Sequence, residues 1–438
     1  MLRRLLPLYL LLWAAPVFAS TQPIWQIGDN TLDATATEYV GVMGNPGITA
    51  TEDANYQIVP AAGVFSEWCI WLSTAPGAGT QYVFTLRQGA TGGALSDTAM
   101  TITIADTNTR GCSRQTAVAY TAGQRIAISI VPTGTPATPS MASYMLFSPT
   151  TADQVIWMGG RGTSPTSTTA ANWYHPLEAI RDANEDDKYI PIAETLTVAY
   201  LYVEITTDPG TGSWAFDWRD CGTLASVSCA DSVVDCSIAA GASPLACNSG
   251  GDSLAMTAGD MASLQGAPSS ITNLFTTLHV GVRFDMGTPD TFITATASDI
   301  DMDDNQRMFG ALIEGQFTAN ASETAQAIPT LTPFVQARSI YAWLSADPGT
   351  APDAYTYTIR GDTVGDGNLD QANDDTACAV TVTANATTGS TTGCTDRIYL
   401  SQPTMAIDPN NATQTLTMDS AWGMGWQFLG LRRKGAAQ

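Results

Sequence analysis

The chain has 438 residues, of which 41 are acidic and 18 basic, and its formal net charge is −23. A surface this acidic repels phosphate backbones and anionic headgroups, so nucleic acid and membrane surfaces are disfavoured as partners. Only 13% of the residues are charged, and Thr, Ala, Ser and Gly fill much of the remainder. This composition is typical of an extracellular β-protein rather than of a helical enzyme.

Residues 1–19 have the organisation of a signal peptide. Arg3 and Arg4 precede an apolar run that is too short to anchor the chain in a bilayer. Val17, Phe18 and Ala19 supply the small-residue cleavage site that follows such a run. We therefore expect cleavage before Ser20, no membrane anchor, and a secreted, extracellular protein.

One phrase then recurs three times. It reads CIWLSTAPGAGTQYVFTLR at 69–87, LYVEITTDPGTGSWAFDWR at 201–219 and YAWLSADPGTAPDAYTYTIR at 341–360. In each copy, apolar residues alternate with others on both sides of a Pro-Gly pair, which is the pattern of two β-strands that bury one face. We expect each phrase to form the central hairpin of a β-sandwich.

Further short strand-like runs follow each phrase, separated by turn residues at intervals of about 8–12 residues. The predicted fold class is therefore all-β, with three tandem antiparallel β-sandwich domains of about eight strands each, of jelly-roll or Greek-key type. The predicted boundaries are 20–150 for the first repeat with an N-terminal extension, 151–304 for the second with an acidic linker, 305–430 for the third, and 431–438 for a basic tail. Residues 20–36 either form a strand of their own domain or add to a sheet edge of a neighbouring subunit.

The eight cysteines divide evenly among the repeats, as self-contained domains require. In an exported chain they are typical of disulfide bonds rather than of a metal site. The simplest pairing joins Cys69 to Cys112, Cys221 to Cys229, Cys236 to Cys247 and Cys378 to Cys394, although the sequence leaves other connectivities open. In this pairing the last two bonds each staple a hairpin and stabilise it by about 3 kcal/mol.

The first copy of the phrase, S-T-A-P-G-A-G-T-x-Y-x-F-T-L-R, resembles a motif of tandem β-sandwich repeats in uncharacterised secreted bacterial and phage-associated proteins. In those repeats a strand-turn-strand with paired cysteines often follows, which the pairs Cys236–Cys247 and Cys378–Cys394 resemble. The first copy departs from this pattern, because Met100 or Thr101 stands in place of the first cysteine. The resemblance implies the fold and an extracellular setting, and it implies no activity.

Few residues are candidates for catalysis. His175 and His279 are the only histidines, and both lie outside any recognised catalytic motif, so we expect them to be structural. Glu204 stands where the other copies have Trp71 and Trp343, on the strand face opposite the expected core, where a glutamate is ordinarily solvated. No second carboxylate matches it as an acid–base pair. We therefore expect a protein that is not an enzyme, with a glycoside hydrolase as the remaining enzymatic alternative.

A calcium site is possible in the stretch GDTVGDGNLDQANDD at 361–375. Asp362, Asp366, Asn368 and Asp370 have spacings like the first half of a calcium-binding loop, but Val364 stands where an oxygen ligand belongs. The alternative is a solvated acidic loop without a cofactor. Three N-glycosylation sequons also occur and arise easily by chance in a Thr-rich chain; they begin at Asn320, Asn385 and Asn411.

Together these features predict a secreted, non-enzymatic structural protein, a subunit of an extracellular filament, sheath or surface assembly. Its expected partners are other copies of itself or other surface proteins. The alternative is a carbohydrate-binding or adhesin-type module, in which Trp71 and Trp343 stack on glycans from the outer strand face. The same two rings fit equally well as packing against an adjacent sheet or domain, which we favour.

Overall fold

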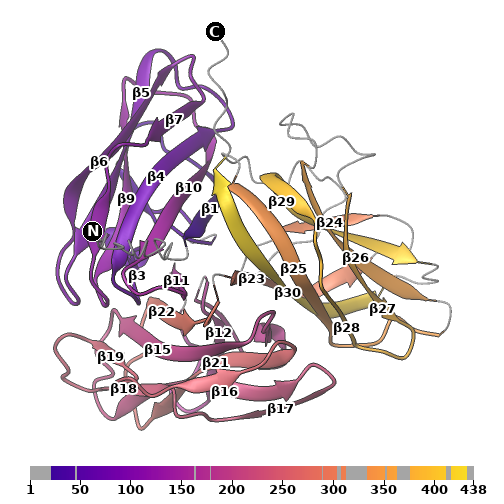
Figure 1. Ribbon diagram of the computed structural model, residues 1–438. Coiled ribbons are helices and arrows are strands. Elements are labelled where there is room, and N and C mark those ends of the chain that lie inside the picture. The colour runs from indigo at the N-terminus through magenta and orange to yellow at the C-terminus, as the bar shows by residue number, and fades with distance from the viewer. Residues whose placement is uncertain are drawn as a thin grey trace, which may run out of the picture.

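The structure is a computed structural model of the whole chain. It describes residues 21–44, 47–161, 164–177, 179–288, 290–302, 307–311, 333–350, 353–362, 375–410 and 416–431. These residues form three antiparallel β-sandwiches and contain no α-helix, so the predicted all-β class is confirmed (Figure 1). The only helical turns in the described parts of the chain are short, and none has the length or apolar character needed to cross a membrane.

Repeat 1 is a jelly roll with one additional short strand in each sheet. Its elements are β1 (Gln22–Thr31), β2 (Glu38–Val40), the 3-10 turn η1 (Glu52–Ala54), β3 (Gln57–Ile58), β4 (Gly63–Leu72), β5 (Gly77–Gly89), β6 (Ser96–Asp106), β7 (Arg110–Ser113), β8 (Val118–Tyr120), β9 (Arg125–Thr133) and β10 (Ser140–Pro149). One sheet has the order β1-β10-β4-β7, and the other has the order β2-β9-β5-β6. This interleaving of early and late strands is the two-Greek-key arrangement of jelly rolls. The N-terminal extension is part of it, because β1 pairs with β10 of the same repeat.

Repeat 2 has the same topology. Its elements are β11 (Gln154–Arg161), β12 (Asn172–His175), β13 (Ile180–Asp182), η2 (Asp186–Lys188), β14 (Ile190–Pro191), β15 (Leu196–Ile205), β16 (Ser213–Thr223), β17 (Ser226–Ala230), β18 (Asp235–Ala239), β19 (Ala246–Asn248), β20 (Leu254–Met256), β21 (Asp260–Ser269) and β22 (Leu278–Asp285). One sheet has the order β11-β22-β15-β19. The other has β12, β21 and β16 at its centre, with β18 paired to β16.

Repeat 3 begins earlier than the sequence predicted. Its strands are β23 (Asp290–Met302), β24 (Met308–Ala311), β25 (Pro333–Leu344), β26 (Ala354–Asp362), β27 (Asp375–Thr383), β28 (Thr388–Thr392), β29 (Arg397–Asn410) and β30 (Leu416–Leu431). β23 pairs along its length with β30, the last strand of this repeat, just as β1 pairs with β10. The predicted boundary at residue 304 is therefore wrong, because residues 298–302, which were predicted to belong to an acidic linker, are the end of β23.

The repeated phrase is an arch between sheets and not a hairpin, so that prediction was also wrong. β4 belongs to one sheet and β5 to the other, and β15 and β16 are divided in the same way. In the third copy β25 and β26 likewise do not pair with each other. The alternating side chains still face the core, and those of the first copy are Trp68, Ile70 and Leu72 in β4 and Tyr82, Phe84 and Leu86 in β5. The Pro-Gly turn therefore carries the chain across the sandwich.

Each phrase ends in an arginine that holds the next strand of its sandwich. Arg87, Arg219 and Arg360 form ion pairs with aspartates that lie shortly beyond the phrase in each repeat. Two of them also bind a glutamate at the start of a 3-10 turn: Arg87 binds Glu52, the first residue of η1, and Arg219 binds Glu185, which directly precedes η2. The recurring arginine therefore has a structural explanation.

All eight cysteines are paired, and two of the bonds differ in role from the sequence interpretation. Cys69–Cys112 joins the neighbouring strands β4 and β7, and Cys221–Cys229 joins β16 and β17. Cys236–Cys247 connects β18 to β19, and these strands lie in opposite sheets. Cys378–Cys394 connects β27 to the turn after β28, and these strands pair with different neighbours, β26 and β25, in the eight-stranded sheet of repeat 3. Cys236–Cys247 therefore ties the two sheets of repeat 2 together, and neither of these two bonds staples a hairpin.

Candidate functional site

A group of interacting, buried polar side chains lies where repeat 1 meets repeat 2. Tyr56, beside β3, stacks on His279 of β22 with the ring centroids 3.6 Å apart. The two ring nitrogens of His279 lie 2.7 Å and 3.0 Å from the backbone oxygens of Tyr56 and Asp53. Gly281, two residues along the same strand, allows the close approach, because a Cβ there would lie 2.6 Å from the carbonyl oxygen of Ile58.

His279 is a structural residue of this junction. Burial lowers its pKa to about 3, and the nearby Arg125 charge adds to the effect. The two backbone oxygens favour the protonated ring, but burial and Arg125 outweigh them, so His279 is neutral near pH 7. His175 is also fully buried, and burial lowers its pKa to about 3 as well. Neither ring is exposed to a substrate.

Glu204 of β15 is buried in the same junction, with 1% of its surface exposed. Its carboxylate accepts a hydrogen bond from Arg125 Nε at 2.8 Å and one from the Gly92 amide at 3.0 Å. The guanidinium of Arg125 also lies 4.2 Å from the ring centroid of Tyr56. The expectation of a solvated glutamate was therefore wrong, because repeat 1 covers the outer face of this sheet.

Repeats 2 and 3 join through an equivalent contact. Tyr189, which follows η2 as Tyr56 follows η1, packs edge-on against Trp343 of β25 at 5.2 Å. A Cβ at Gly423 of β30 would lie 2.5 Å from the backbone oxygen of Pro191. Trp343 is 7% exposed, so its predicted packing against an adjacent domain is confirmed.

A second carboxylate lies in this junction. Glu194 accepts a hydrogen bond from the Ser339 hydroxyl at 3.1 Å, and the same hydroxyl lies 2.8 Å from the backbone oxygen of Ala193. Burial raises the pKa of Glu194 to about 7, the Asp290 charge raises it further, and Ser339 and Arg338 oppose the shift. This group therefore titrates near neutral pH.

Repeat 1 also contacts repeat 3. Trp25 of β1 stacks on Trp426 of β30, with ring centroids 5.0 Å apart. The side-chain amide of Gln22 meanwhile exchanges two hydrogen bonds of 2.8 Å with the backbone of Ile156 in repeat 2. The three sandwiches therefore contact one another mutually, as Figure 1 shows, rather than forming an extended row.

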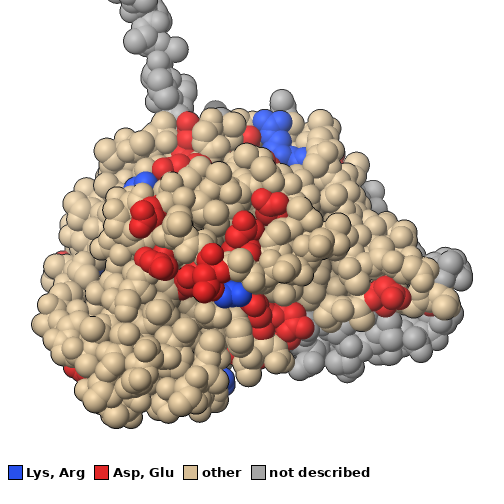
Figure 2. All heavy atoms as spheres, turned by 90° about the horizontal axis from the view of Figure 1, so that it is seen from below, with Lys and Arg blue, Asp and Glu red and all other residues tan. Residues whose placement is uncertain are grey.

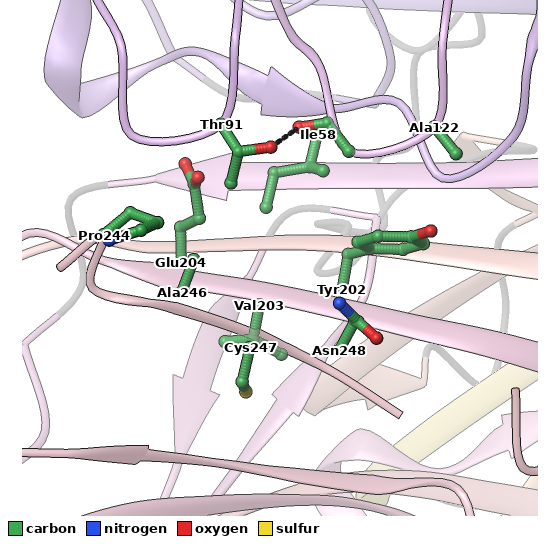
Figure 3. Close-up of a pocket in the computed structure, with 11 residues that line it drawn as sticks. Ile58, Thr91, Ala122, Tyr202, Val203, Glu204, Pro244, Ala246, Cys247 and Asn248 are labelled. Atoms are coloured by element: carbon green, nitrogen blue, oxygen red, sulfur yellow. Dashed lines mark hydrogen bonds between the residues drawn. The ribbon is translucent and has the colours of Figure 1, made fainter. Parts of the chain in front are cut away.

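A cleft remains beside each of the two equivalent junctions. The first has a volume of about 350 Å³ and lies between repeat 1 and the β15–β19 edge of repeat 2 (Figure 3). Its lining is Ile58, Thr91, Ala122, Gly123, Tyr202, Val203, Glu204, Pro244, Ala246, Cys247 and Asn248. The second, of about 450 Å³, lies between repeat 2 and the β25–β28 edge of repeat 3. It is lined by Thr223, Leu224, Ala225, Thr257, Ala258, Gly259, Asp260, Tyr341, Thr388, Gly389 and Ser390.

The surface of repeat 2 carries part of the chain's acidic excess. Figure 2 shows Asp and Glu side chains gathered across the middle of the face seen from below, with few basic groups among them. Asp217 and Asp235 are direct neighbours across β16 and β18. Burial raises the pKa of Asp217 to about 6, with Asp231 and Asp235 adding to the shift. Such a face repels a polyanionic partner.

Several predicted sites fall outside the described residues. The signal peptide and the candidate calcium ligands Asp366, Asn368 and Asp370 lie there, as does the side chain of Asp362. Of the sequons, those beginning at Asn320 and Asn411 lie there too, whereas Asn385 is exposed in the turn between β27 and β28. One acidic–sulfur cluster occurs among the described residues, Glu185 with Cys221 and Cys229, but those sulfurs are bonded to each other and offer no thiolate.

Comparisons with known proteins add little to this picture. No protein-family model matches the sequence, and no curated protein matches it. Among solved structures, the N-terminal CBM22-1-CBM22-2 tandem domain from Paenibacillus barcinonensis Xyn10C aligns with 52% of this chain and 80% of its own, at 10% sequence identity and a TM-score of 0.17. A superposition this poor carries no functional information, and the fold assignment rests on the sheet topology.

Proposed function

We propose that the chain is a secreted, non-enzymatic structural protein that acts as a rigid subunit of an extracellular assembly. The observation that carries this proposal is the repeated junction. Tyr56 on His279 and Tyr189 on Trp343 occupy equivalent places, and glycines on the receiving strands bring the backbones together in both. Contacts of this kind hold neighbouring domains in one orientation, which suits a building block.

The chemistry of the polar groups supports a structural role. The His279 ring lies against backbone oxygens, and the Glu204 carboxylate is bound to Arg125 and a backbone amide. Groups held in this way are poorly placed for proton transfer, which requires access to a substrate. The four disulfides fit an oxidising compartment outside the cell.

The outer face of repeat 1 is where we place the contact with a second copy of the chain. Trp71 lies opposite Ala142 in its sheet, as Glu204 lies opposite His279 and Trp343 opposite Ala421. In repeats 2 and 3 the preceding repeat covers this position. Trp71 is instead only partly buried, and the exposed Arg110 lies 5.4 Å from its ring centroid.

Electron microscopy and light scattering of the purified native protein test the proposal. We expect regular oligomers or filaments that grow with protein concentration, and we expect Trp71→Ala to prevent their formation. Val131→Ala is the matched control, because Val131 is an exposed apolar residue of the same repeat, with 39% of its surface accessible. A protein that stays monomeric at every concentration refutes the assembly role, and assembly unaffected by Trp71→Ala refutes this contact surface. Release of sugar from a polysaccharide panel would contradict the non-enzymatic role.

A further inference from the structure

We propose that the two junction clefts are equivalent binding sites for a neutral carbohydrate. This inference goes beyond the structural role, and it places glycan binding away from Trp71 and Trp343. It depends on three features of the described residues, which are the equivalence of the two clefts, the chemistry of their walls, and their volumes.

The two clefts are built from the same parts. A Thr-Ala-Gly turn closes each from the preceding repeat, at 121–123 in the first cleft and 257–259 in the second. The glycine of each turn has a positive φ and faces a tyrosine of the next repeat. A Cβ on Gly123 would lie 3.5 Å from the Tyr202 ring, and one on Gly259 would lie 3.4 Å from the Tyr341 ring. The tyrosines occupy the same position in the repeated phrase.

The wall opposite each turn is also equivalent. Tyr202 pairs across the sheet with Asn248 of β19, and Tyr341 pairs with Ser390 of β28. Each tyrosine therefore stands beside an amide or a hydroxyl that lines the same cleft. Figure 3 shows Tyr202 and Asn248 side by side, with Thr91 and Ala122 contributed from repeat 1. Tyr202 is half-buried, whereas Tyr341 is 6% exposed and offers the cleft only part of its ring.

This combination of groups fits a sugar better than an ion or a purely apolar ligand. An aromatic ring packs against the C–H face of a pyranose, and amide and hydroxyl groups both donate and accept hydrogen bonds. No Lys or Arg is among the described residues that line either cleft. The lining carboxylates are already engaged, Glu204 with Arg125 and Asp260 with the backbone and hydroxyl of Thr257. The volumes lie within the range of small-ligand sites, which is about 300–1,000 Å³.

The test uses soluble neutral oligosaccharides of glucose, xylose, mannose and N-acetylglucosamine, titrated calorimetrically into the full chain. Ala122→Trp and Ala258→Trp each place a large ring in one cleft, and both alanines are exposed, so the fold should tolerate the change. Ala119→Trp and Ala255→Trp are the matched controls. These alanines are also exposed, precede the others by three positions, and line neither cleft.

We expect at least one probe to bind at two sites with millimolar affinity. Each cleft-filling variant should remove one site, the double variant should weaken binding by about tenfold or more, and the controls should leave both sites intact. The proposal is overturned if no probe binds the folded protein, or if binding is the same in the double variant. Either result leaves the assembly measurements above unaffected, so the two proposals fail independently.

Discussion

Replacing Glu204 by alanine measures how strongly repeats 1 and 2 are joined. The side chain of Glu204 is 2% exposed and that of its partner Arg125 is 14% exposed, so both charges are removed from bulk water. The change leaves the guanidinium without its counter-charge and the Gly92 amide without its acceptor. Breaking a buried ion pair in this way costs about 3–5 kcal/mol. Arg125 retains its bond to the Gly93 backbone oxygen at 2.7 Å, so we expect the lower end of that range, about 3 kcal/mol.

A double-mutant cycle separates the pair from its surroundings. Arg125→Met alone should destabilise the protein by a similar amount, because it leaves a buried carboxylate. The combined Glu204→Ala and Arg125→Met variant should cost less than the sum of the two, with a coupling of about 2 kcal/mol. Denaturant unfolding followed by tryptophan fluorescence gives the free energies. Hydrogen exchange of residues 56–59 should accelerate in both single variants.

The control is Asp252→Ala, which removes an exposed carboxylate of the same repeat and should change stability by less than about 0.5 kcal/mol. A Glu204→Ala effect as small as the control's, or two strictly additive single changes, would refute the view that this pair joins the repeats.

Three further outcomes follow from the same structure. Burial lowers the pKa of His279 from 6.5 to about 3, so between these values the unfolded chain binds a proton at this residue that the folded chain does not. The share of His279 in the stability should therefore fall by about 1.4 kcal/mol per pH unit as the pH drops from 6.5 toward 3. Denaturant unfolding at a series of pH values should show a slope that is shallower by this amount in His279→Gln. Burial raises the pKa of Glu194 from 4.5 to about 7. Its contribution to the stability of the second junction is therefore present below pH 4.5 and is lost as the pH rises through about 7. Hydrogen exchange near Ser339 should lose this pH dependence in Glu194→Gln. Replacing Cys378 and Cys394 by serine opens a bridge across 16 residues and should lower the free energy of unfolding by about 3 kcal/mol in denaturant titrations.

Each of these expectations has a result that contradicts it. An unchanged acid slope in His279→Gln would mean that folding does not lower the pKa of this ring. A pH dependence that persists in Glu194→Gln would assign the titration to another group. Equal stability of the oxidised and serine forms would mean that the Cys378–Cys394 bond contributes nothing to the stability of repeat 3.

Much of the architecture could be predicted because strands that bury one face leave a period of two in the sequence. That period and the recurring Pro-Gly pair locate β4, β5 and their equivalents in all three repeats. The same period does not show which strands are hydrogen-bonded to each other. The side chains of a strand alternate identically whether the next strand in the sequence lies in the same sheet or across the core. For this reason the sequence predicts a hairpin where β4 and β5 form an arch, and it likewise predicts a hairpin stapled by Cys236 and Cys247 where that bond joins two sheets.

The junctions were harder to predict, because the face that a neighbouring domain covers has no distinctive local pattern. Glu204 has the sequence context of a solvated strand residue, and only the position of repeat 1 buries it. A signal was nevertheless present. EDANY at 52–56 and EDDKY at 185–189 share their first two residues and a final tyrosine, and these tyrosines are the two that dock on the next repeat. Thr-Ala-Gly likewise occurs at both turns that close the clefts, and comparing the repeats with one another would have found both motifs.

The placement of the disulfides determines how the molecule would respond to being pulled. In repeat 2 a covalent tether joins the two sheets at Cys236–Cys247, but its two cysteines are only 11 residues apart, and those of Cys378–Cys394 in repeat 3 are 16 apart. The bond of repeat 1, Cys69–Cys112, lies within a single sheet but joins cysteines that are 43 residues apart. Chain enclosed by a disulfide cannot extend under load, so repeat 1 should gain the least length when it unfolds, and repeats 2 and 3 should extend further because their bridges enclose less chain.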